Sequence, residues 1–584
     1  MISFEADRLD RTTVKQKYTR RLDKAPLPLV ADLVGTSIKS CIPFQRKVRK
    51  MSNERGYNLK LLPHDASRSL ISRRQFLQTA LALGLDASAS SLWAQPAGIA
   101  PRKGGIFRAG LSDGSSTDSF DPATTASLYM IQLGYAFRTY LTEITPSNQV
   151  GPDSAQTWES SPDAKVWKFK LFRGQEFHNG KALRASDVVA SLNYHRRPDS
   201  TSGAKTLLKD VAEIRADDPD VVVITLSSGV ADLPCVLADY HLPIMPADGS
   251  GGVDWRSGVG AGPYKITRFQ PGIGAELIRN TMYHRSNQAY FDGLHLLVLN
   301  DVNARQTALL NNEVDAIVNL DLRTLPLLRR NRSIEIDEVP GGSYNGMPMN
   351  CLVPPFNDPN VRIAMKYALN REEIVAKIMN GHATVGNDQP VSPIMPYAAK
   401  ISQRHYDPDK ARFYLRKAGL DSLQVQLSTS EAAGANAVDM AVLFKQGASK
   451  SGIDVGVVRE SADGYWSNVW LKKPFVVVNA GQRPTPDIVF SQFFQDGAAW
   501  NDTNWHNDRF QSLLLAAKSM LDQKKRSAMY AEMQAICSDD GGYLIPFFAN
   551  KVSARRSNVK HAQAVSSAWE LDGGRAYQRW WFGD

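Results

Sequence analysis

Hydrophobic and polar positions alternate most clearly over residues 166–172, where Trp167, Phe169 and Leu171 are separated by lysines. A period of two predicts a β-strand with one buried and one solvated face. Shorter apolar runs predict further strands at residues 104–110, 221–226, 262–269 and 294–299. The predicted strands are therefore concentrated in the first half of the chain.

Helical spacing of apolar residues is clearest in the second half. Asp358-Pro359 supplies an N-cap and a proline at the first helical position, which predicts a helix at this point. A second helix is expected to begin at Asn370, with Glu373 reaching back as in a capping box, and to end at Gly381. Two more helices are expected over residues 407–419 and around Met529, Met533 and Ile536. Strands and helices together predict a mixed α/β architecture.

The composition is that of a compact globular chain. Of the 584 residues, 43% are hydrophobic and 22% are charged. These values are close to the averages for soluble proteins and exclude global disorder, collagen and a coiled coil. By the usual domain size of about 150 residues, the length accommodates three or four average domains or two large lobes.

The net charge of +10 is confined to the N-terminal part of the chain. Residues 1–50 contain 12 Lys and Arg against 5 Asp and Glu, and residues 51–103 contain 7 against 3. Residues 104–584 are therefore close to neutral. A protein that binds nucleic acid concentrates positive charge on its folded body, so we expect no nucleic-acid partner.

An export signal is predicted before the folded body. Residues 72–77 read Ser-Arg-Arg-Gln-Phe-Leu, and the apolar stretch that follows ends at Leu85. That stretch is about half as long as a bilayer-spanning helix, which indicates a cleaved signal and not an anchor. The pattern resembles the signal of the twin-arginine (Tat) export pathway. We expect cleavage after Ala89 or Ala94, and a periplasmic mature protein.

The start of the chain has two interpretations. Translation from Met51 would make residues 51–94 a complete Tat signal peptide and residues 1–50 a non-native addition. Alternatively, residues 1–50 form a genuine basic extension.

Motifs for catalysis, metal binding and nucleotide binding are incomplete or absent. The sequence contains no H-E-x-x-H, no EF-hand spacing and no phosphate-binding loop, so we expect neither a metal nor a cofactor. Residues 110–114 match the hydrolase pattern G-x-S-x-G around Ser112, but no helix is expected directly after them, which favours a turn. His178 follows the predicted strand at residues 166–172 and is expected to be a hydrogen-bonded turn residue.

The predicted mature chain has three cysteines, Cys235, Cys351 and Cys537, without C-x-x-C spacing. An odd number in this arrangement excludes a zinc ribbon and a redox motif. We expect three buried apolar thiols, with a single disulfide as the alternative.

Aromatic residues and amides are concentrated between residues 465 and 505, a composition typical of a cleft that excludes water around a polar ligand. The aromatic residues are Tyr465, Trp466, Trp470, Phe493, Phe494, Trp500 and Trp505.

A series of short motifs across residues 104–582 resembles the extracytoplasmic solute-binding proteins of family 5, which serve ABC importers of oligopeptides, dipeptides and nickel. Each motif is weak alone, but their common order along the chain is specific. The matching blocks are Phe169-Lys170-Leu171-Phe172-Arg173-Gly174, Phe177-His178-Asn179-Gly180, Ala185-Ser186-Asp187-Val188, Gly260-Ala261-Gly262-Pro263-Tyr264, Glu313-Val314-Asp315, Pro355-Phe356-Asn357-Asp358, Ala368-Leu369-Asn370-Arg371, Tyr406-Asp407-Pro408 and Ile545-Pro546.

The resemblance implies a two-lobed periplasmic-binding-protein fold of class II, of the large peptide-binding type. Lobe I would comprise residues 104–345, with an extra subdomain, and residues 542–584, while lobe II would comprise residues 346–541. The two chain crossings, near Tyr344 and Gly542, would form a hinge, and the ligand would be trapped in the interlobe cleft when the hinge closes.

The resemblance also implies where the ligand is anchored. Peptide binders of this family hold the peptide amine with an aspartate on a turn after a strand of the second lobe. Here that strand is expected at residues 475–478 and the turn at residues 479–487, which puts Gln482 at the anchoring position. A neutral amide does not pair with an ammonium as a carboxylate does, whereas the adjacent Arg483 suits a carboxylate or phosphate. Asp487 remains an alternative anchor.

We therefore expect a non-catalytic receptor that delivers a peptide-like or other small polar solute to an ABC permease. It would act as a monomer after export by the Tat machinery. The alternatives are a secreted hydrolase, or a ligand-binding sensor or chaperone on the same fold. The expected ligand-binding residues are Tyr129, in the loop region after the first strand, with Tyr344, Asn345, Trp466, Asn479, Gln482, Arg483, Trp500 and Trp505.

Overall fold

The computed structural model describes residues 100–583. The expectations for residues 1–50, for the Tat signal at residues 51–94 and for its cleavage site lie outside the described residues. Within the described part of the chain, no helix is both long enough and apolar enough to cross a membrane.

The largest sheet has ten strands in the order β16-β12-β18-β11-β1-β10-β9-β8, with β13 paired to β18 and β17 paired to β12. β1 pairs in parallel with β10 and β11, and the other pairs are antiparallel. The strands predicted at residues 104–110, 262–269 and 294–299 correspond to β1, β8 and β10. The strands are β1 (Ile106–Leu111), β8 (Tyr264–Gln270), β9 (Gly274–Arg279), β10 (Gly293–Val298), β11 (Ala316–Ile317), β12 (Ile334–Pro348), β13 (Ala383–Val385), β16 (Val478–Ala480), β17 (Tyr543–Leu544) and β18 (Phe547–Arg556).

A second, antiparallel sheet has the order β4-β5-β7-β6. Its strands are β4 (Ala155–Ser160), β5 (Val166–Leu171), β6 (Val211–Asp218) and β7 (Val221–Leu226), and α3 (Ala185–Arg196) lies against β6 and β7. In β5, Trp167, Phe169 and Leu171 are buried and the alternate positions are exposed, which confirms the strand predicted from the alternation.

Most helices lie in the second half of the chain, as predicted, but the expectation that strands are concentrated in the first half is wrong, because β12 and β18 lie in the second half. The second half also holds the parallel pair β14 (Leu423–Thr429) and β15 (Ile453–Arg459). Asp358 caps its helix through a hydrogen bond from the Asn360 N–H, as expected. The expected capping box at Asn370 is wrong in one detail, because Glu373 accepts from the Asn370 side-chain amide and not from its backbone. The helices are α7 (Pro359–Tyr367), α8 (Arg371–Lys377), α9 (Pro408–Lys417), α10 (Ala437–Ser449), α11 (Tyr465–Asn468), α12 (Pro486–Phe493), α13 (Asp508–Ser519) and α14 (Gln523–Asp540).

Smaller elements complete the fold. They are η1 (Pro122–Thr124), α2 (Leu128–Phe137), β2 (Thr142–Ile144), β3 (Val150–Pro152), α4 (Leu233–Val236), α5 (Val302–Leu310), α6 (Leu325–Leu328), η2 (Glu431–Ala433), β19 (Val559–Lys560), α15 (Glu570–Gly573), α16 (Ala576–Arg579) and β20 (Trp581–Phe582).

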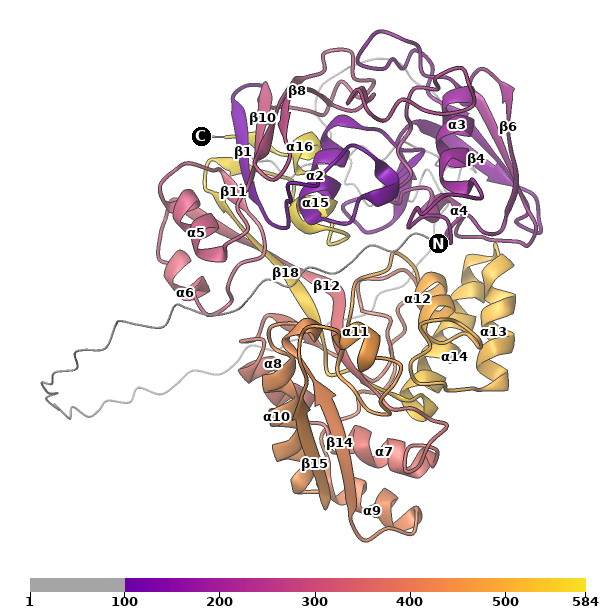
Figure 1. The fold of residues 1–584 in the computed structure, drawn as a ribbon, viewed down its shortest axis with the longest axis vertical. Coiled ribbons are helices and arrows are strands. Elements are labelled where there is room, and N and C mark those ends of the chain that lie inside the picture. Colours follow the sequence, from indigo (N-terminus) through magenta and orange to yellow (C-terminus); the bar gives the residue numbers. More distant parts are fainter. Residues whose placement is uncertain (1–99, 584) are drawn as a thin grey trace, which may run out of the picture. The chain divides into compact units, whose positions relative to one another are not determined.

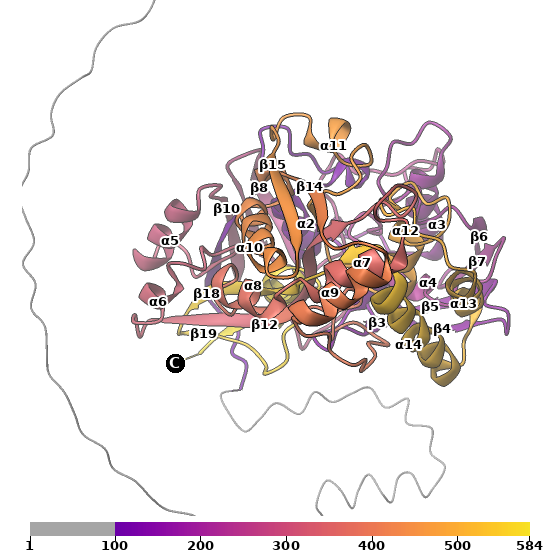
Figure 2. The same cartoon turned by 90° about the horizontal axis from the view of Figure 1, so that it is seen from below.

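Two long strands join the two halves of the fold. β12 pairs with β18 from Ile334 opposite Arg556 to Ser343 opposite Ala549, and Figure 1 shows both strands running between the group around β1 and β10 and the group around α8 and α10. One large core is built from residues 344–548, whereas separate cores hold residues 141–261 and residues 107–318 with 559–580. Figure 2 shows α10 lying alongside β14 and β15 in the second group. The fold therefore has two lobes with independent cores.

Candidate functional site

A cavity of about 420 Å³ lies between the two lobes. One wall comes from residues 135–241 and 568–575, and the other comes from residues 394–396 and 482–500. A further hollow of about 490 Å³ beside Arg108 involves the first lobe alone, and its arginine is already paired with Asp315 at 2.8 Å. The interlobe cavity is therefore the candidate ligand site.

The second-lobe wall is built on the turn between β16 and α12. Thr485 caps α12 by accepting a hydrogen bond from Ile488 N–H, and Pro486 is the first residue of the helix. Both residue types favour the start of a helix, so the connecting turn ends at Thr485. The Gln482 N–H donates to Ser343 Oγ, and Gln482 Oε1 accepts from the Gly342 N–H at 2.9 Å. These bonds attach the turn to β12.

Arg483 is fixed by neutral partners. Its Nε donates to Gln492 Oε1 at 2.7 Å, its Nη1 donates to Gly481 O at 3.0 Å, and its guanidinium lies 5.6 Å from the centre of the Phe493 ring. Burial lowers the pKa of Arg483 below its ordinary value, because the charged form loses hydration. The turn therefore presents a partly desolvated cation to the cavity.

The first-lobe wall carries both charged and aromatic groups. Asp239 Oδ1 accepts hydrogen bonds from the backbone N–H of His241 at 3.0 Å and from its ring Nδ1 at 2.7 Å. The Tyr240 ring packs edge-on against Trp569 at 5.3 Å, and burial raises the pKa of Tyr240 to about 12. This wall therefore offers a carboxylate, a phenol and an indole.

Arg575 lies on the same wall, but its charge is neutralised from behind. It is 3.0 Å from Asp153 and 3.4 Å from Glu143, and its guanidinium stacks on Tyr135. The four residues from Leu571 to Gly574 have φ between 52° and 77°, in the left-handed region. Such strain persists only where surrounding contacts over-determine the backbone, and it is concentrated at ligand sites.

A second cavity of about 470 Å³ adjoins the interlobe cavity, which is called the first cavity from here on. Six residues line both of them, namely Thr206, Leu207, Val236, Ile488, Gln492 and Trp500. Beyond these, Val, Leu and Ala side chains form about half of the second cavity's lining, and the polar part includes Lys209, Asp487, Ser491 and the Lys518–Asp210 ion pair (3.0 Å). The two cavities together can hold a ligand with a polar and an apolar part.

Three of the sequence-predicted site residues, Gln482, Arg483 and Trp500, line the first cavity. Three more lie on the β12–β16 pairing beside it. Tyr344 is opposite Ala480, and Asn345 is opposite Asn479. The side chain of Asn345 donates to Ala433 O at 2.6 Å.

The other three predicted residues do not line either cavity. Trp466 is 40% exposed on α11 and packs against Trp470. Trp505 is 2% exposed, and its indole N–H donates to Asp540 at 2.9 Å, so it belongs to the second-lobe core. Tyr129 is fully buried in α2, and its expected loop position is wrong because Ser127 caps a helix there.

The strand that precedes the turn begins three residues later than expected. It was predicted at residues 475–478, whereas β16 runs from Val478 to Ala480 and Phe475 makes only an isolated bridge to Met349. Asp487, the alternative anchor, lies inside α12, is 5% exposed and faces Tyr530. It lines the second cavity and not the first.

Sequence reasoning missed Asp239, Tyr240, His241, Trp569 and Arg575 on the first-lobe wall. No periodic pattern marks these residues. The adjacent glycines Gly573 and Gly574 were the one available signal, because successive glycines indicate a backbone with positive φ.

The structure also bears on the motifs weighed for chemistry. Ser112 follows β1, but the next helix, η1, begins only at Pro122, and Ser112 Oγ accepts a hydrogen bond from Asn319. The strand–nucleophile–helix turn of a hydrolase elbow is therefore not formed. His178 is a hydrogen-bonded turn residue, as predicted, with Gly260 N–H and Gly262 O as partners. Over residues 100–583, no cluster of three or more His, Cys, Asp or Glu could hold a metal ion.

The three cysteines are free thiols, as expected. Cys235 and Cys537 are buried, but Cys351 is only partly buried, so the expectation of three buried thiols is wrong for one of them.

Comparison with known proteins places these features in one family. The model for "Bacterial extracellular solute-binding proteins, family 5 Middle" matches residues 149–502. The dipeptide-binding protein of Escherichia coli K12 is 23% identical, over 71% of this chain and 84% of that protein. The glutathione-binding protein GsiB of Salmonella choleraesuis SC-B67 is 25% identical, over 76% of this chain and 90% of that protein.

Solved structures agree on the fold. DppA from Helicobacter pylori in complex with the peptide STSA superimposes with a TM-score of 0.67 at 22% identity, over 82% of this chain and 99% of that one. HbpA2 from Haemophilus parasuis gives a TM-score of 0.74 at 19% identity, over 82% of this chain and all of that one.

The chain therefore belongs to the bacterial extracellular solute-binding proteins of family 5 and has their two-lobed α/β fold. Its role is that of an extracellular solute-binding protein.

Proposed function

We propose that this protein captures its solute in the interlobe cavity by closure of the two lobes and passes it, unchanged, to the transmembrane subunits of an ABC importer. The observation that carries the proposal is the composition of that cavity. Its walls come from both lobes, with Asp239 and Trp569 on one side and Arg483 and Trp500 on the other, so that a bound solute would hold the lobes together.

The lobe limits are part of the proposal. Lobe I comprises residues 104–345 and 542–584, and lobe II comprises residues 346–541. The separate cores support this division, although Tyr543 to Phe548 pack in the second-lobe core before the chain returns along β18. Gln482, Arg483 and Trp500 are the proposed ligand contacts, with Tyr344, Asn345 and Asn479 beside them.

A peptide-like solute is supported by the relatives named for dipeptide and glutathione binding. Capture by closure needs no second subunit, so the protein acts as a monomer. It needs no catalytic group either, and the hydrogen-bonded Ser112 outside the cavity agrees with a receptor that performs no chemistry.

Native mass spectrometry of the mature protein, from about residue 95 and purified from its own periplasm, tests the proposal. We expect a stoichiometric small adduct on a monomer, released intact by denaturation. Conversion of the released molecule by wild-type protein, but not by Ser112→Ala, would instead establish an enzyme.

Export is tested separately. Replacing both arginines of the signal (Arg73→Lys with Arg74→Lys) is expected to leave the protein in the cytoplasm, because the twin arginines are what the Tat receptor reads. Arg68→Lys, in the same basic region, is the matched control. Unchanged periplasmic yield of the double variant would show that another pathway exports the protein.

A further inference from the structure

The cationic side chains that line the first cavity differ in whether a carboxylate lies beside them. Arg575 contacts Asp153 and Glu143, and the ring of His241 contacts Asp239. Arg483 has no carboxylate within 4.0 Å among residues 100–583, and its partners are Gln492 and two backbone carbonyls. Its Nη2 has no hydrogen-bond partner in the described part of the chain.

Arg483 is only partly buried, and a partly desolvated guanidinium with no carboxylate at ion-pair distance would be stabilised by an anionic partner. Burial lowers the pKa of Arg483, while the more distant Asp239 and the phenols of Tyr344 and Tyr240 act in the opposite direction. Gln482 beside it is neutral, and its side-chain oxygen is occupied by Gly342 N–H. The turn is therefore built to receive negative charge, and it offers no carboxylate to an ammonium.

The adjoining second cavity has the opposite character. Val211, Leu226, Val230, Leu233 and Ile488 contribute to its lining, and Lys518 is already neutralised by Asp210. Asp487, on its wall, is a carboxyl whose pKa is raised to about 6 by burial and by Asp232. The exposed Lys209 also lines this cavity, and the cavity's Val, Leu and Ile side chains would desolvate an apolar substituent.

We propose that the solute carries a carboxylate or phosphate that pairs with Arg483 and an apolar substituent that fills the second cavity. Asp239, across the first cavity, leaves Oδ2 for a hydrogen-bond donor between these two parts. This inference rests on the proposed function and names the class of solute that the interlobe site takes: an amphiphilic anion, with no need for a free amine at Gln482.

Four matched probes test both parts of the proposal by isothermal titration calorimetry on the mature protein after removal of any bound solute. They are N-acetylglycine, N-hexanoylglycine and the two corresponding glycinamides. A charge-assisted hydrogen bond predicts that N-hexanoylglycine binds at least tenfold more tightly than its amide. Burial of four additional methylenes predicts that it also binds at least tenfold more tightly than N-acetylglycine.

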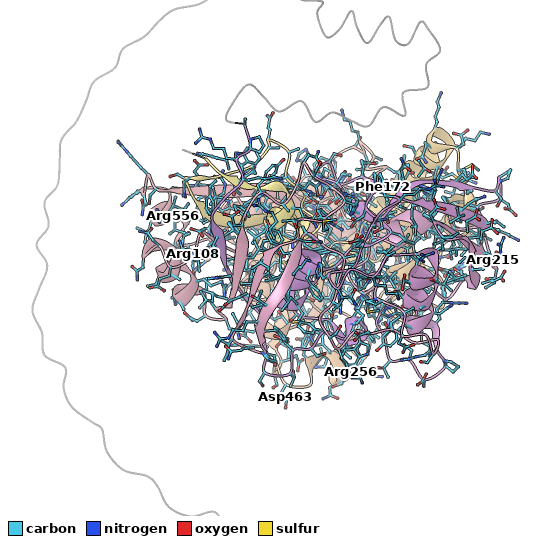
Figure 3. All side chains as sticks on the ribbon, turned by 90° about the horizontal axis from the view of Figure 1, so that it is seen from above. Arg108, Phe172, Arg215, Arg256, Asp463 and Arg556 are labelled. Atoms are coloured by element: carbon cyan, nitrogen blue, oxygen red, sulfur yellow. The ribbon has the colours of Figure 1, made fainter. Side chains whose placement is uncertain are left out.

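Variants assign the effect to Arg483. Arg483→Gln is expected to bring the affinities of N-hexanoylglycine and its amide within about twofold, and Arg483→Lys is expected to restore part of the preference because it keeps the charge without the guanidinium fork. Arg256→Gln is the control. Arg256 is exposed, stacks on Trp255 at 4.1 Å and is labelled at the periphery in Figure 3. Thermal unfolding verifies that each variant is folded.

Equal binding of acid and amide by the wild-type protein overturns the anionic part, and equal binding of acetyl and hexanoyl probes overturns the apolar part. Failure of all four probes at 10 mM overturns the whole inference. The proposed function fails separately, if the protein from its own periplasm carries no solute and does not close on any extract fraction measured by small-angle X-ray scattering.

Discussion

Gln482 Oε1 accepts a hydrogen bond from the Gly342 N–H at 2.9 Å, which joins the cavity turn to the strand that runs between the lobes. The side-chain oxygen of Gln482, the residue at the expected anchoring position, is therefore already hydrogen-bonded to the backbone of β12. A Cβ on Gly342 would lie 2.8 Å from Gln482 Cγ, so the close approach requires glycine at that position. The neutral Gln482 side chain therefore fastens the turn of the second lobe to β12.

Gln482→Glu tests this arrangement. The carboxylate can still accept from Gly342 N–H, but it adds a negative charge beside Arg483, where we propose that the solute's anion binds. We expect the affinity for N-hexanoylglycine to fall at least tenfold, or about 1.4 kcal/mol, with little change in the free energy of unfolding. Gln482→Met is the matched control, since it leaves Gly342 N–H unpaired and is expected to cost about 1–3 kcal/mol of stability. Unaltered affinity in Gln482→Glu would show that Arg483 does not contact the ligand.

The tryptophans Trp500 and Trp505 are predicted to have separable roles. Trp500 is 44% exposed and lines both cavities, whereas Trp505 is 2% exposed and donates to Asp540. Trp505→Ala is expected to destabilise the protein by about 3–5 kcal/mol through loss of packing. Trp500→Ala is expected to lower probe affinity at least fivefold at nearly unchanged stability. Urea denaturation and calorimetry measure the two quantities, and a large loss of stability in Trp500→Ala would contradict the assignment.

An ion pair between the lobes offers a third test. Asp232 precedes α4 of the first lobe and pairs with Arg526 of α14, which also lies between the Tyr397 and Tyr530 rings. Removing one partner of a buried pair leaves the other charge uncompensated, with a typical cost of about 3 kcal/mol or more. Asp232→Asn is therefore expected to favour separation of the lobes.

Small-angle X-ray scattering of the ligand-free variant measures that separation as a larger radius of gyration, and calorimetry is expected to show at least tenfold weaker probe binding. Arg509→Gln is the control, because the Arg509–Glu532 pair is exposed and lies within the second lobe, and such pairs are worth about 1 kcal/mol or less. Identical scattering curves for wild type and Asp232→Asn would show that the pair does not hold the lobes together.

The elements that the sequence predicted are those with a local cause. β5 follows from alternation and α7 from Asp358-Pro359, because pleat and capping act within a few residues. The sequence predicts Trp505 as a site residue from the aromatic composition of residues 465–505 and Tyr129 from an expected loop position, and neither pattern shows what surrounds a side chain. Trp505 donates a hydrogen bond to Asp540, and Tyr129 packs in the core around α2. Both contacts depend on the tertiary structure.

The first-lobe wall was unpredictable for the same reason. Asp239 and Arg575 are 336 positions apart in the chain, and only the return of residues 568–575 to the first lobe brings them to one cavity. Arg483 was found because the resemblance aligned a single turn, but the sequence does not show that no carboxylate accompanies it. That observation needs the packed structure.

The carboxyl of Asp502 predicts a pH-dependent stability. It is 8% exposed and accepts hydrogen bonds from Tyr543 Oη at 2.6 Å and Trp470 Nε1 at 3.1 Å, and burial raises its pKa from 3.8 to about 6. Because the folded pKa is above the unfolded one, the native state holds the proton more tightly, and the contribution of Asp502 to stability is lost as pH rises from about 4 through 6.

Asp502→Asn cannot ionise. The free energy of unfolding of Asp502→Asn minus that of wild type is therefore expected to be about 2 kcal/mol higher at pH 7.5 than at pH 4.5. Urea denaturation at both pH values measures the difference, with the exposed Asp463→Asn as the control. A constant difference between Asp502→Asn and wild type at the two pH values would show that this carboxyl titrates in its ordinary range.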